Sequence, residues 1–487
     1  MAGYLRRLLA GSAAYQAAGL LASALALFTL PLYTAHIAQD EYGYAETLLT
    51  AIILTSILLR LGLGEALVRF WFDDEDPGRR RRLARRVTGW TFTVTTAAAA
   101  VLVVFAGPVS EALLDTRDAT LLAYGVLGLW AFTNLEIAYA LLRVEERRAR
   151  YLRASCANVL LTVGLTVTLV VGLDYGGRGY VLGNYAASTI VLLALWAADR
   201  DRVAFRPPGR PALRALVRFG GPTVPADAAV FALNVLDRAY LVRAESPSAA
   251  GAYAAAAKLS AIVIVAVRGF QAAWPPLAYS ITDDAEAARL YARVTTAYVV
   301  VTGSVVCAVT LLGRFVVDLL VAYDGVFEAV PWVALGWALY GLYLLFVTIA
   351  GRVRAMSRNL PAAAAGLVVN VVLLVVLVDP LGIAGAGIAL CGAYVVMLLV
   401  IHRLTRELFA VPFERRRLAG AVAVLGGVAV AGELLLPTDG VDGVLLRALA
   451  LACAAPLLVA AGVVRRQELA ALRTAARAQV ARRRGRP

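Results

Sequence analysis

The sequence predicts an all-α membrane protein of about fourteen transmembrane helices. We expect two six-helix bundles related by a pseudo-two-fold axis, followed by two extra C-terminal helices. Three observations predict this class. Apolar segments long enough to cross a bilayer recur along the chain. Most arginines lie in alternate gaps between these segments, and short cytoplasmic loops keep positive charge in this way. The first six segments also resemble the next six weakly.

The composition excludes an ordinary soluble protein. The chain has 487 residues, of which 61% are hydrophobic and 16% are charged. Soluble domains carry about 25% charged residues. The net charge of +14 comes from arginines that are spread over many loops rather than gathered on one face. Contact with anionic lipid headgroups therefore explains the charge, and we expect no nucleic-acid partner.

The predicted spans follow one another with short connections. They cover residues 9–32, 44–69, 87–107, 119–142, 153–173, 180–198, 216–241, 250–274, 294–313, 329–350, 361–378, 383–402, 418–436 and 443–464. The first apolar segment is too long for a cleavable signal and is expected to remain as an anchor. An even number of spans places both termini on one side, and the arginines at both ends predict that this side is the cytoplasm. The expected location is the cytoplasmic (inner) membrane.

Three arginine-rich loops are expected to be cytoplasmic, and one of them marks a predicted domain boundary. Loops 73–86, 143–153 and 199–214 carry clustered arginines, and the third is also the longest proline-rich stretch. This third loop is the best candidate for a hinge between two halves. The predicted domains are an N-terminal six-helix half, a C-terminal six-helix half, two extra helices and a basic cytoplasmic tail, at residues 1–205, 206–410, 411–464 and 465–487.

Short motifs recur in the two halves. Residues 41–45 after the first span resemble residues 250–254 after the seventh, and the glycines of 176–179 resemble those of 382–387. Six spans followed by six in the same orientation form a parallel repeat about an axis along the membrane normal. Many transporters have this design, with the substrate site between the halves. The alternative is that any two helical hairpins look alike at this level.

No residue pattern indicates catalysis, a metal or a cofactor. The four cysteines all lie inside apolar segments and form no CxxC pair, and two histidines are too few for a zinc site. There is also no nucleotide-binding motif, so ATP is not expected to drive the protein directly.

Charged residues at membrane depth are costly and usually face a cavity or a partner. In span 2, Glu65 and Arg69 lie four residues apart and are best explained as a structural or snorkelling pair. Arg60 lies deeper and is a candidate cavity residue. Glu136 in span 4 either binds a proton or cation or pairs with Arg60, and pairing is slightly favoured.

Spans 7 and 8 carry further candidates for lining a substrate cavity. Asp227, Asn234 and Arg238 fall on one helix face and form a polar stripe. Lys258, the only lysine, and Arg268 lie in span 8. Two interpretations of Lys258 remain open. It forms a structural ion pair with Asp227 or Asp237, or it contacts a substrate phosphate.

Residues 216–280 resemble the polysaccharide-type flippases, the O-antigen and exopolysaccharide translocases of the multidrug/oligosaccharidyl-lipid/polysaccharide exporter superfamily. The resemblance lies in an ordered series of short motifs: Gly221-Pro222, Asp237-Arg238, Gly251 to Tyr253, and Trp274 with Pro276. Residues 61–64 with 69–70 resemble the end of the second span of this family, and residues 380–386 the start of its twelfth. The similarity covers residues 1–410, and spans 13 and 14 match the fourteen-span branches.

The resemblance implies that the chain flips a glycan carried on polyprenyl pyrophosphate to the outer leaflet by alternating access. Expected partners are this substrate, membrane lipids, and a glycan polymerase and glycosyltransferases of the same pathway. One alternative is a cation-coupled drug exporter or a peptidoglycan-precursor flippase of the same superfamily. An alternative of another class is a membrane glycosyltransferase or glycan polymerase. Such an enzyme needs catalytic carboxylates in an outer loop, and Asp40 with Glu41 is better explained by the turn into span 2.

Overall fold

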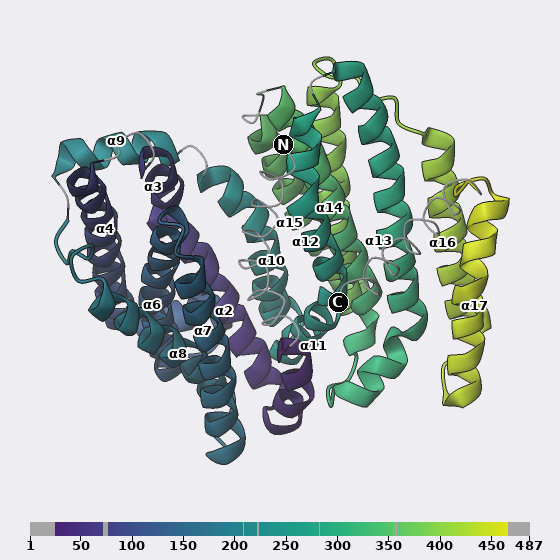
Figure 1. The fold of residues 1–487 in the computed structure, drawn as a ribbon. Coiled ribbons are helices and arrows are strands. Elements are labelled where there is room, and N and C mark those ends of the chain that lie inside the picture. Colours follow the sequence, from purple (N-terminus) through teal and green to yellow (C-terminus); the bar gives the residue numbers. More distant parts are fainter. Residues whose placement is uncertain are drawn as a thin grey trace, which may run out of the picture. The chain divides into compact units, whose positions relative to one another are not determined.

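A computed structural model describes residues 25–71, 76–207, 209–221, 224–281, 283–353, 355 and 358–465 (Figure 1). These residues form helices joined by short loops, which confirms the predicted all-α class. Most of the predicted first span and the basic tail lie outside the described residues.

The long helices follow the apolar segments of the sequence. The first eight α-helices are α2 (Gln39–Arg60), α3 (Leu63–Trp71), α4 (Pro77–Val104), α5 (Ala106–Leu114), α6 (Ala119–Val144), α7 (Arg148–Val167), α8 (Gly176–Ala198) and α9 (Arg210–Gly220). They are followed by α10 (Val224–Ala244), α11 (Pro247–Leu259), α12 (Ala261–Ser280), α13 (Asp284–Leu320), α14 (Val330–Arg352), α15 (Asn359–Thr405), α16 (Arg415–Leu435) and α17 (Gly440–Ala460). A π-turn at Thr168–Gly172 extends α7, and a 3₁₀ turn at Val326–Glu328 precedes α14.

Within the described residues, 11 helices are long and apolar enough to cross a membrane. The difference from fourteen has identifiable causes. The range of α15 contains two predicted spans, which are two helices separated by the non-helical backbone of Gly382 at φ 56°. α10 has the length of a span but carries several charges, among them Asp237 and Arg238. The first predicted span lies mostly outside the described residues.

Several predicted continuous spans are broken helices. The prediction of one span over 44–69 is wrong, because α2 ends at a left-handed Leu61 and α3 begins at Leu63. Between them Gly62 has φ +68° and lies against the backbone of Gly220, so a side chain has no room there. The predicted span 250–274 is likewise divided into α11 and α12 around Ser260, whose hydroxyl donates to the Val330 carbonyl at 3.0 Å.

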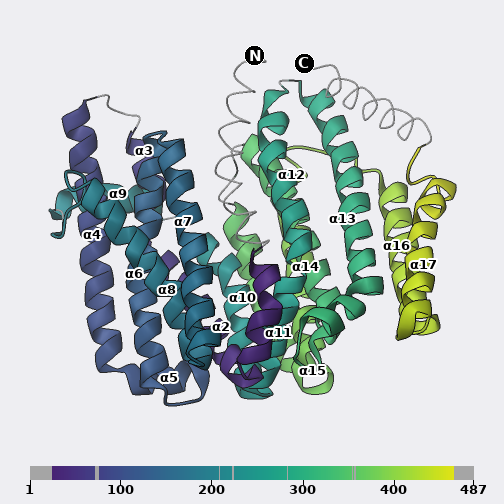
Figure 2. The same cartoon turned by 60° about the horizontal axis from the view of Figure 1, so that its bottom comes forward.

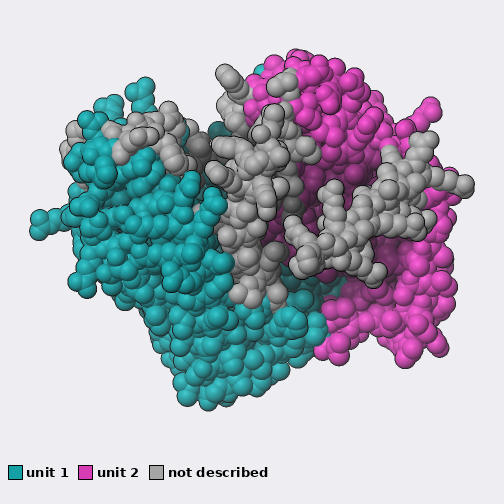
Figure 3. All heavy atoms as spheres, viewed as in Figure 1, with its two compact units in different colours: residues 1–261, 320–333, 357–400 teal, residues 262–319, 334–356, 401–487 magenta. Residues whose placement is uncertain are grey.

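The described chain forms two compact units (Figure 3). Unit 1 contains residues 1–261, 320–333 and 357–400, and unit 2 contains residues 262–319, 334–356 and 401–487. In unit 1, α6 packs against α4 and α8, while α2 packs against α10 and α11. The boundaries predicted at residues 205, 410 and 464 stay predictions.

One local arrangement occurs twice in unit 1, as the predicted repeat requires. The Glu41 carboxylate accepts a hydrogen bond from the Gly177 backbone at 2.8 Å, next to Gly176 at φ +50°. Glu245 lies beside Gly382 at φ +56°, where an added Cβ would be 3.1 Å from its Oε1. In each case an acidic residue at the end of one span lies against a left-handed glycine at the start of another.

In unit 2, α16 and α17 pack side by side (Figure 2). The Arg447 side chain is fully buried and donates to the carbonyls of Pro437 at 2.9 Å and Leu311 at 3.2 Å. It also forms an ion pair with Glu433. This one side chain therefore ties α17 to α13, to the end of α16 and to the connection that follows it.

We expect Arg447→Met to lower the stability of unit 2, because it leaves Glu433 and two carbonyls without this donor. Each unsatisfied buried group costs about 1–3 kcal/mol. The measurement is the temperature at which half of the detergent-solubilised protein stays monodisperse. The double variant Arg447→Met with Glu433→Gln should recover part of the loss. A single variant as stable as the wild type would contradict the structural role of Arg447.

Candidate functional site

Unit 1 contains a buried network of charged and phenolic groups centred on Glu46. Glu46 Oε1 accepts from Lys258 Nζ at 2.6 Å, and its Oε2 accepts from Arg238 Nη1 at 3.2 Å. The Tyr180 hydroxyl also donates to Oε1 at 2.6 Å. The side chains of Glu46, Arg238 and Lys258 are only 7%, 14% and 20% exposed. One buried carboxylate is therefore shared by two buried cations.

Helical spacing places three members of this network on one face of α2. Tyr42, Glu46 and Thr50 follow one another at intervals of four residues, so their side chains lie one above the other. Lys258 Nζ lies 2.5 Å from the Tyr42 hydroxyl, and Arg238 donates to the Thr50 hydroxyl. The side of α2 that faces α10 and α11 thus carries a row of oxygen atoms, which accept hydrogen bonds from Arg238 and Lys258.

Two glycines allow α2 and α11 to approach closely enough for these contacts. A Cβ at Gly43 would collide with the Pro247 carbonyl, and a Cβ at Gly251 would collide with the Gln39 carbonyl. Gly43 belongs to the repeated motif at residues 41–45, and Gly251 belongs to the one at residues 250–254. The two copies of the motif therefore lie against each other, because their glycines allow the two backbones to come into contact.

Aromatic rings enclose the ammonium group of Lys258. Its Nζ lies 4.9 Å from the centre of the Tyr42 ring and 5.1 Å from that of the Tyr180 ring. Both distances are in the range of cation–π attraction. With one carboxylate and two cations, the network keeps a formal charge of +1. A group with more negative charge than Glu46 is therefore attracted to Lys258 and Arg238.

A second buried carboxylate lies beside the network. Asp237 is fully buried, accepts from the Tyr253 hydroxyl at 2.9 Å and accepts from Asn370 Nδ2 at 3.2 Å. Its chain neighbour Arg238 turns to Glu46 instead. Asp237 and Arg238 therefore bind different partners. Together they link α10 to α2, α11 and α15.

Arg60 and Glu136 form the ion pair that the sequence analysis favoured. Arg60 Nη1 lies 3.5 Å from Glu136 Oε2, which links α2 to α6. Their side chains are 25% and 28% exposed. Partly exposed pairs of this kind contribute about 0–1 kcal/mol, so this one is easily opened. Their role as cavity residues stays a prediction.

Within unit 1, the predicted cavity residues that the structure describes do not all meet. Asp227 lies in the first turn of α10 with an exposed side chain. Arg268 is exposed on α12, in unit 2, beyond the break at Ser260. The side chains of Asn234, Glu65 and Arg69 lie outside the described residues. Among the predicted residues that the structure describes, Arg238 and Lys258 meet at Glu46, and Arg60 pairs with Glu136.

The predicted partner of Lys258 was wrong. Lys258 pairs with Glu46 of α2 rather than with Asp227 or Asp237. Asp237 binds Tyr253 and Asn370 instead. A partner was expected on the adjacent helix, but the contact at Gly43 and Gly251 brings α2, which is distant in sequence, against α11.

Glu46, Tyr42 and Tyr180 were missed as members of the site. A signal was present, because Glu46 is a carboxylate inside an apolar segment and follows Tyr42 by one helical turn. Glu46 lies near the start of the predicted span 44–69, so it was grouped with the acidic residues of the preceding turn, Asp40 and Glu41.

The network joins helices from both predicted halves of the chain. Glu46 and Tyr180 lie in the early turns of α2 and α8, while Arg238 lies near the end of α10 and Lys258 near the end of the short α11. The arginine pattern predicts that the start of α2, the start of α8 and the α10–α11 connection lie on the outer side. Within unit 1 the network links α2 and α8 to α10 and α11.

Residues 8–282 match a family model described as "Polysaccharide biosynthesis protein". No curated protein sequence matches the chain. The fold is similar to that of lipid II flippase MurJ in an inward closed conformation, with a TM-score of 0.74, 12% identity, and coverage of 91% of this chain and 97% of that chain.

Two further solved structures share the fold. One is an inward-facing multidrug resistance MATE family transporter of the MOP superfamily, with a TM-score of 0.63 and 15% identity over 79% of this chain and 97% of that chain. The other is the Vibrio cholerae MATE transporter VcmN in the bent form, with a TM-score of 0.53 and 17% identity over 82% of this chain and 98% of that chain. At these identities the likeness shows the fold.

Proposed function

The chain belongs to the polysaccharide biosynthesis protein family, and we propose that it flips polyprenyl-pyrophosphate-linked glycans across the cytoplasmic membrane by alternating access. Its fold is that of a multi-pass membrane protein. The family match and the buried cationic network in unit 1 support the proposal.

The observation that carries the proposal is the sharing of Glu46 by Lys258 and Arg238. In the state described here, Glu46 on α2 holds two cations on α10 and α11. A pyrophosphate headgroup carries more negative charge than one carboxylate and competes for the same two cations. Binding of the headgroup thus releases the contact between the halves, and loss of the headgroup on the outer side restores it.

Rocking of the two halves explains how the headgroup crosses without entering hydrocarbon. The substrate is bound from the cytoplasmic side, where both termini are expected, and the glycan leaves outside. The polyprenyl chain remains in the bilayer throughout. In this scheme the protein forms no covalent bond with its substrate, and pathway glycosyltransferases and a polymerase supply and consume the glycan.

The test is a flipping assay in proteoliposomes. The three substrates are a polyprenyl-pyrophosphate oligosaccharide, lipid II and a cationic dye, each at matched concentration. We expect the oligosaccharide lipid to be flipped fastest. Preferential movement of lipid II or of the dye would instead support one of the two alternatives within the superfamily.

We expect Lys258→Ala to reduce flipping about ten- to a hundredfold, because a charge-assisted contact is worth about 1.5–3 kcal/mol. Lys258→Arg keeps the charge and should be milder. Arg238 still pairs with Glu46 in Lys258→Ala, so protein abundance should stay near normal. Normal flipping by Lys258→Ala would contradict a role of Lys258 in substrate binding.

A further inference from the structure

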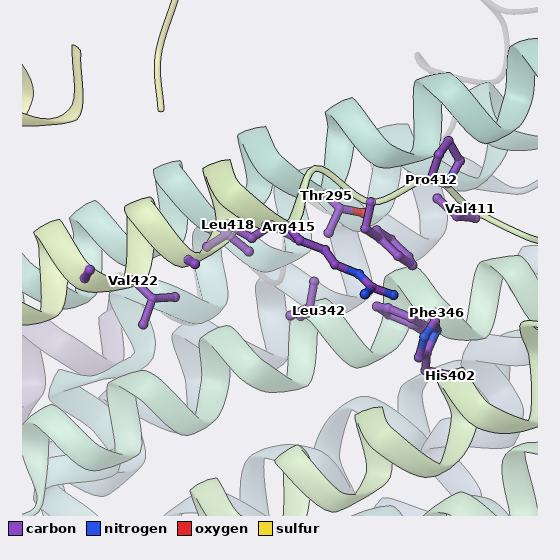
Figure 4. Close-up of a pocket in the computed structure, with 13 residues that line it drawn as sticks. Thr295, Leu342, Phe346, His402, Val411, Pro412, Arg415, Leu418 and Val422 are labelled. Atoms are coloured by element: carbon purple, nitrogen blue, oxygen red, sulfur yellow. The ribbon is translucent and has the colours of Figure 1, made fainter. Parts of the chain in front are cut away.

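Unit 2 contains a second feature that the proposed function does not use, an apolar pocket with a volume of about 750 Å³ (Figure 4). Its walls come from α13, α14, the end of α15, the connection that follows α15, and the first turns of α16. The lining is almost wholly apolar and includes Leu342, Val411, Leu418 and Val422. Two of the lining side chains, His402 and Arg415, carry nitrogen donors.

Aromatic rings fix His402 at the edge of this pocket. The His402 ring lies 5.7 Å from Phe346 and 5.7 Å from Phe413, edge-on to both. Phe346 and Phe413 stack at 5.4 Å. Figure 4 shows the guanidinium of Arg415 reaching across the pocket toward Phe346 and His402. A cation and an imidazole therefore face the same apolar space.

Nearby carboxylate charge is already neutralised. Glu414 accepts from Arg417 Nη1 at 2.9 Å and from the Thr296 hydroxyl at 2.8 Å. Among the residues that the structure describes, no salt bridge joins Arg415 to a carboxylate. Arg415 thus presents an uncompensated charge to the pocket.

The pocket has the depth of a membrane interface. Arg415 is the first residue of α16, and Ala423, also in the lining, lies eight residues further on. At 1.5 Å per residue this is about 12 Å along the helix. The arginine pattern assigns the start of α16 to the cytoplasmic side. Basic pockets between transmembrane helices on that side bind anionic lipid headgroups.

We propose that this pocket binds one anionic glycerophospholipid of the bilayer. Its phosphate contacts Arg415 and His402, and one acyl chain lies along Leu342, Leu418 and Val422. A single cation with a neighbouring imidazole suits one phosphodiester. This contrasts with the two cations at Glu46, which suit a pyrophosphate. The site is separate from the network in unit 1 and does not depend on the proposed function.

The test is native mass spectrometry of the purified full chain, titrated separately with phosphatidylglycerol and with phosphatidylcholine of the same acyl chains. We expect one phosphatidylglycerol to bind at least about tenfold more tightly than phosphatidylcholine. Arg415→Gln should remove this preference. Arg416→Gln is the matched control, since Arg416 is the next residue of the helix and does not line the pocket. Val422→Trp fills the pocket and should weaken both lipids without a change of charge.

Three outcomes would overturn the proposal. Equal binding of the two lipids would mean that Arg415 does not select the headgroup. Equal effects of Arg415→Gln and Arg416→Gln would indicate diffuse attraction to a basic surface. Displacement of phosphatidylglycerol by a polyprenyl-pyrophosphate glycan, with a dependence on Arg415, would identify the occupant as the transported substrate. Each variant is first checked for a monodisperse profile, which a folding defect would change.

Discussion

Glu46→Ala is expected to abolish flipping and to lower protein abundance sharply. Glu46 is the carboxylate shared by Lys258 and Arg238. Its removal leaves two buried cations close together without a counter-charge. Removing one partner of a buried pair typically costs about 3–5 kcal/mol. Membrane abundance and flipping in proteoliposomes measure the two effects separately.

Glu136→Ala is the matched control, because Glu136 also pairs with an arginine inside the helix bundle but is about a quarter exposed. We expect nearly normal abundance for this variant. Glu46→Asp keeps the charge on a shorter side chain and should be intermediate. If Glu46→Ala were as abundant and active as the wild type, the network would contribute neither to stability nor to transport.

Gly43→Leu is expected to have the second large effect. The added side chain would collide with the backbone at Pro247 and force α2 away from α11. Overpacking of a close contact costs about 1–3 kcal/mol and sometimes more. It also separates Glu46 from Lys258, so we expect strongly reduced flipping. The rate per protein molecule in proteoliposomes is the measurement.

Gly164→Leu is the control for this substitution. Gly164 lies within α7, and a Cβ there meets no atom of the described structure within 4 Å. The same change should be tolerated in abundance and rate. Equal effects at Gly43 and Gly164 would show that added bulk in any span is harmful, and that the contact between α2 and α11 has no special role.

Most of the fold follows from hydropathy and charge, because backbone groups in a bilayer must be satisfied within each helix. Apolar length therefore located α6, α8 and α14 well. Breaks were missed where one residue changes the backbone direction. The left-handed Leu61 with Gly62 lies inside an apolar segment, and a hydropathy pattern contains no sign of it. Gly382 breaks the helix in the same way, since its non-helical backbone (φ 56°, ψ −137°) separates two helices within α15, at the boundary that the sequence predicted between spans 361–378 and 383–402.

The site was predicted less completely than the fold. Charges inside spans pointed to Lys258 and Arg238, since such residues need a partner or a cavity. The identity of the partner depends on which helices touch, and sequence adjacency pointed to Asp227 or Asp237, while Glu46 was not considered. The close contact depends on Gly43 and Gly251, which the sequence motifs contain without indicating that the two helices touch.

The central claim is that the outer ends of α2 and α11 must separate during transport. Gln39 Nε2 donates to the Ser248 carbonyl at 3.0 Å, so these two positions lie side by side. The direct measurement is flipping by a Gln39→Cys, Ser248→Cys variant without the four native cysteines. The two cysteines are linked by a short bis-methanethiosulfonate, which forms a reducible disulfide with each thiol and releases methanesulfinate. The account predicts that linkage stops flipping and that reduction restores it. Full flipping by the quantitatively linked protein would contradict the account.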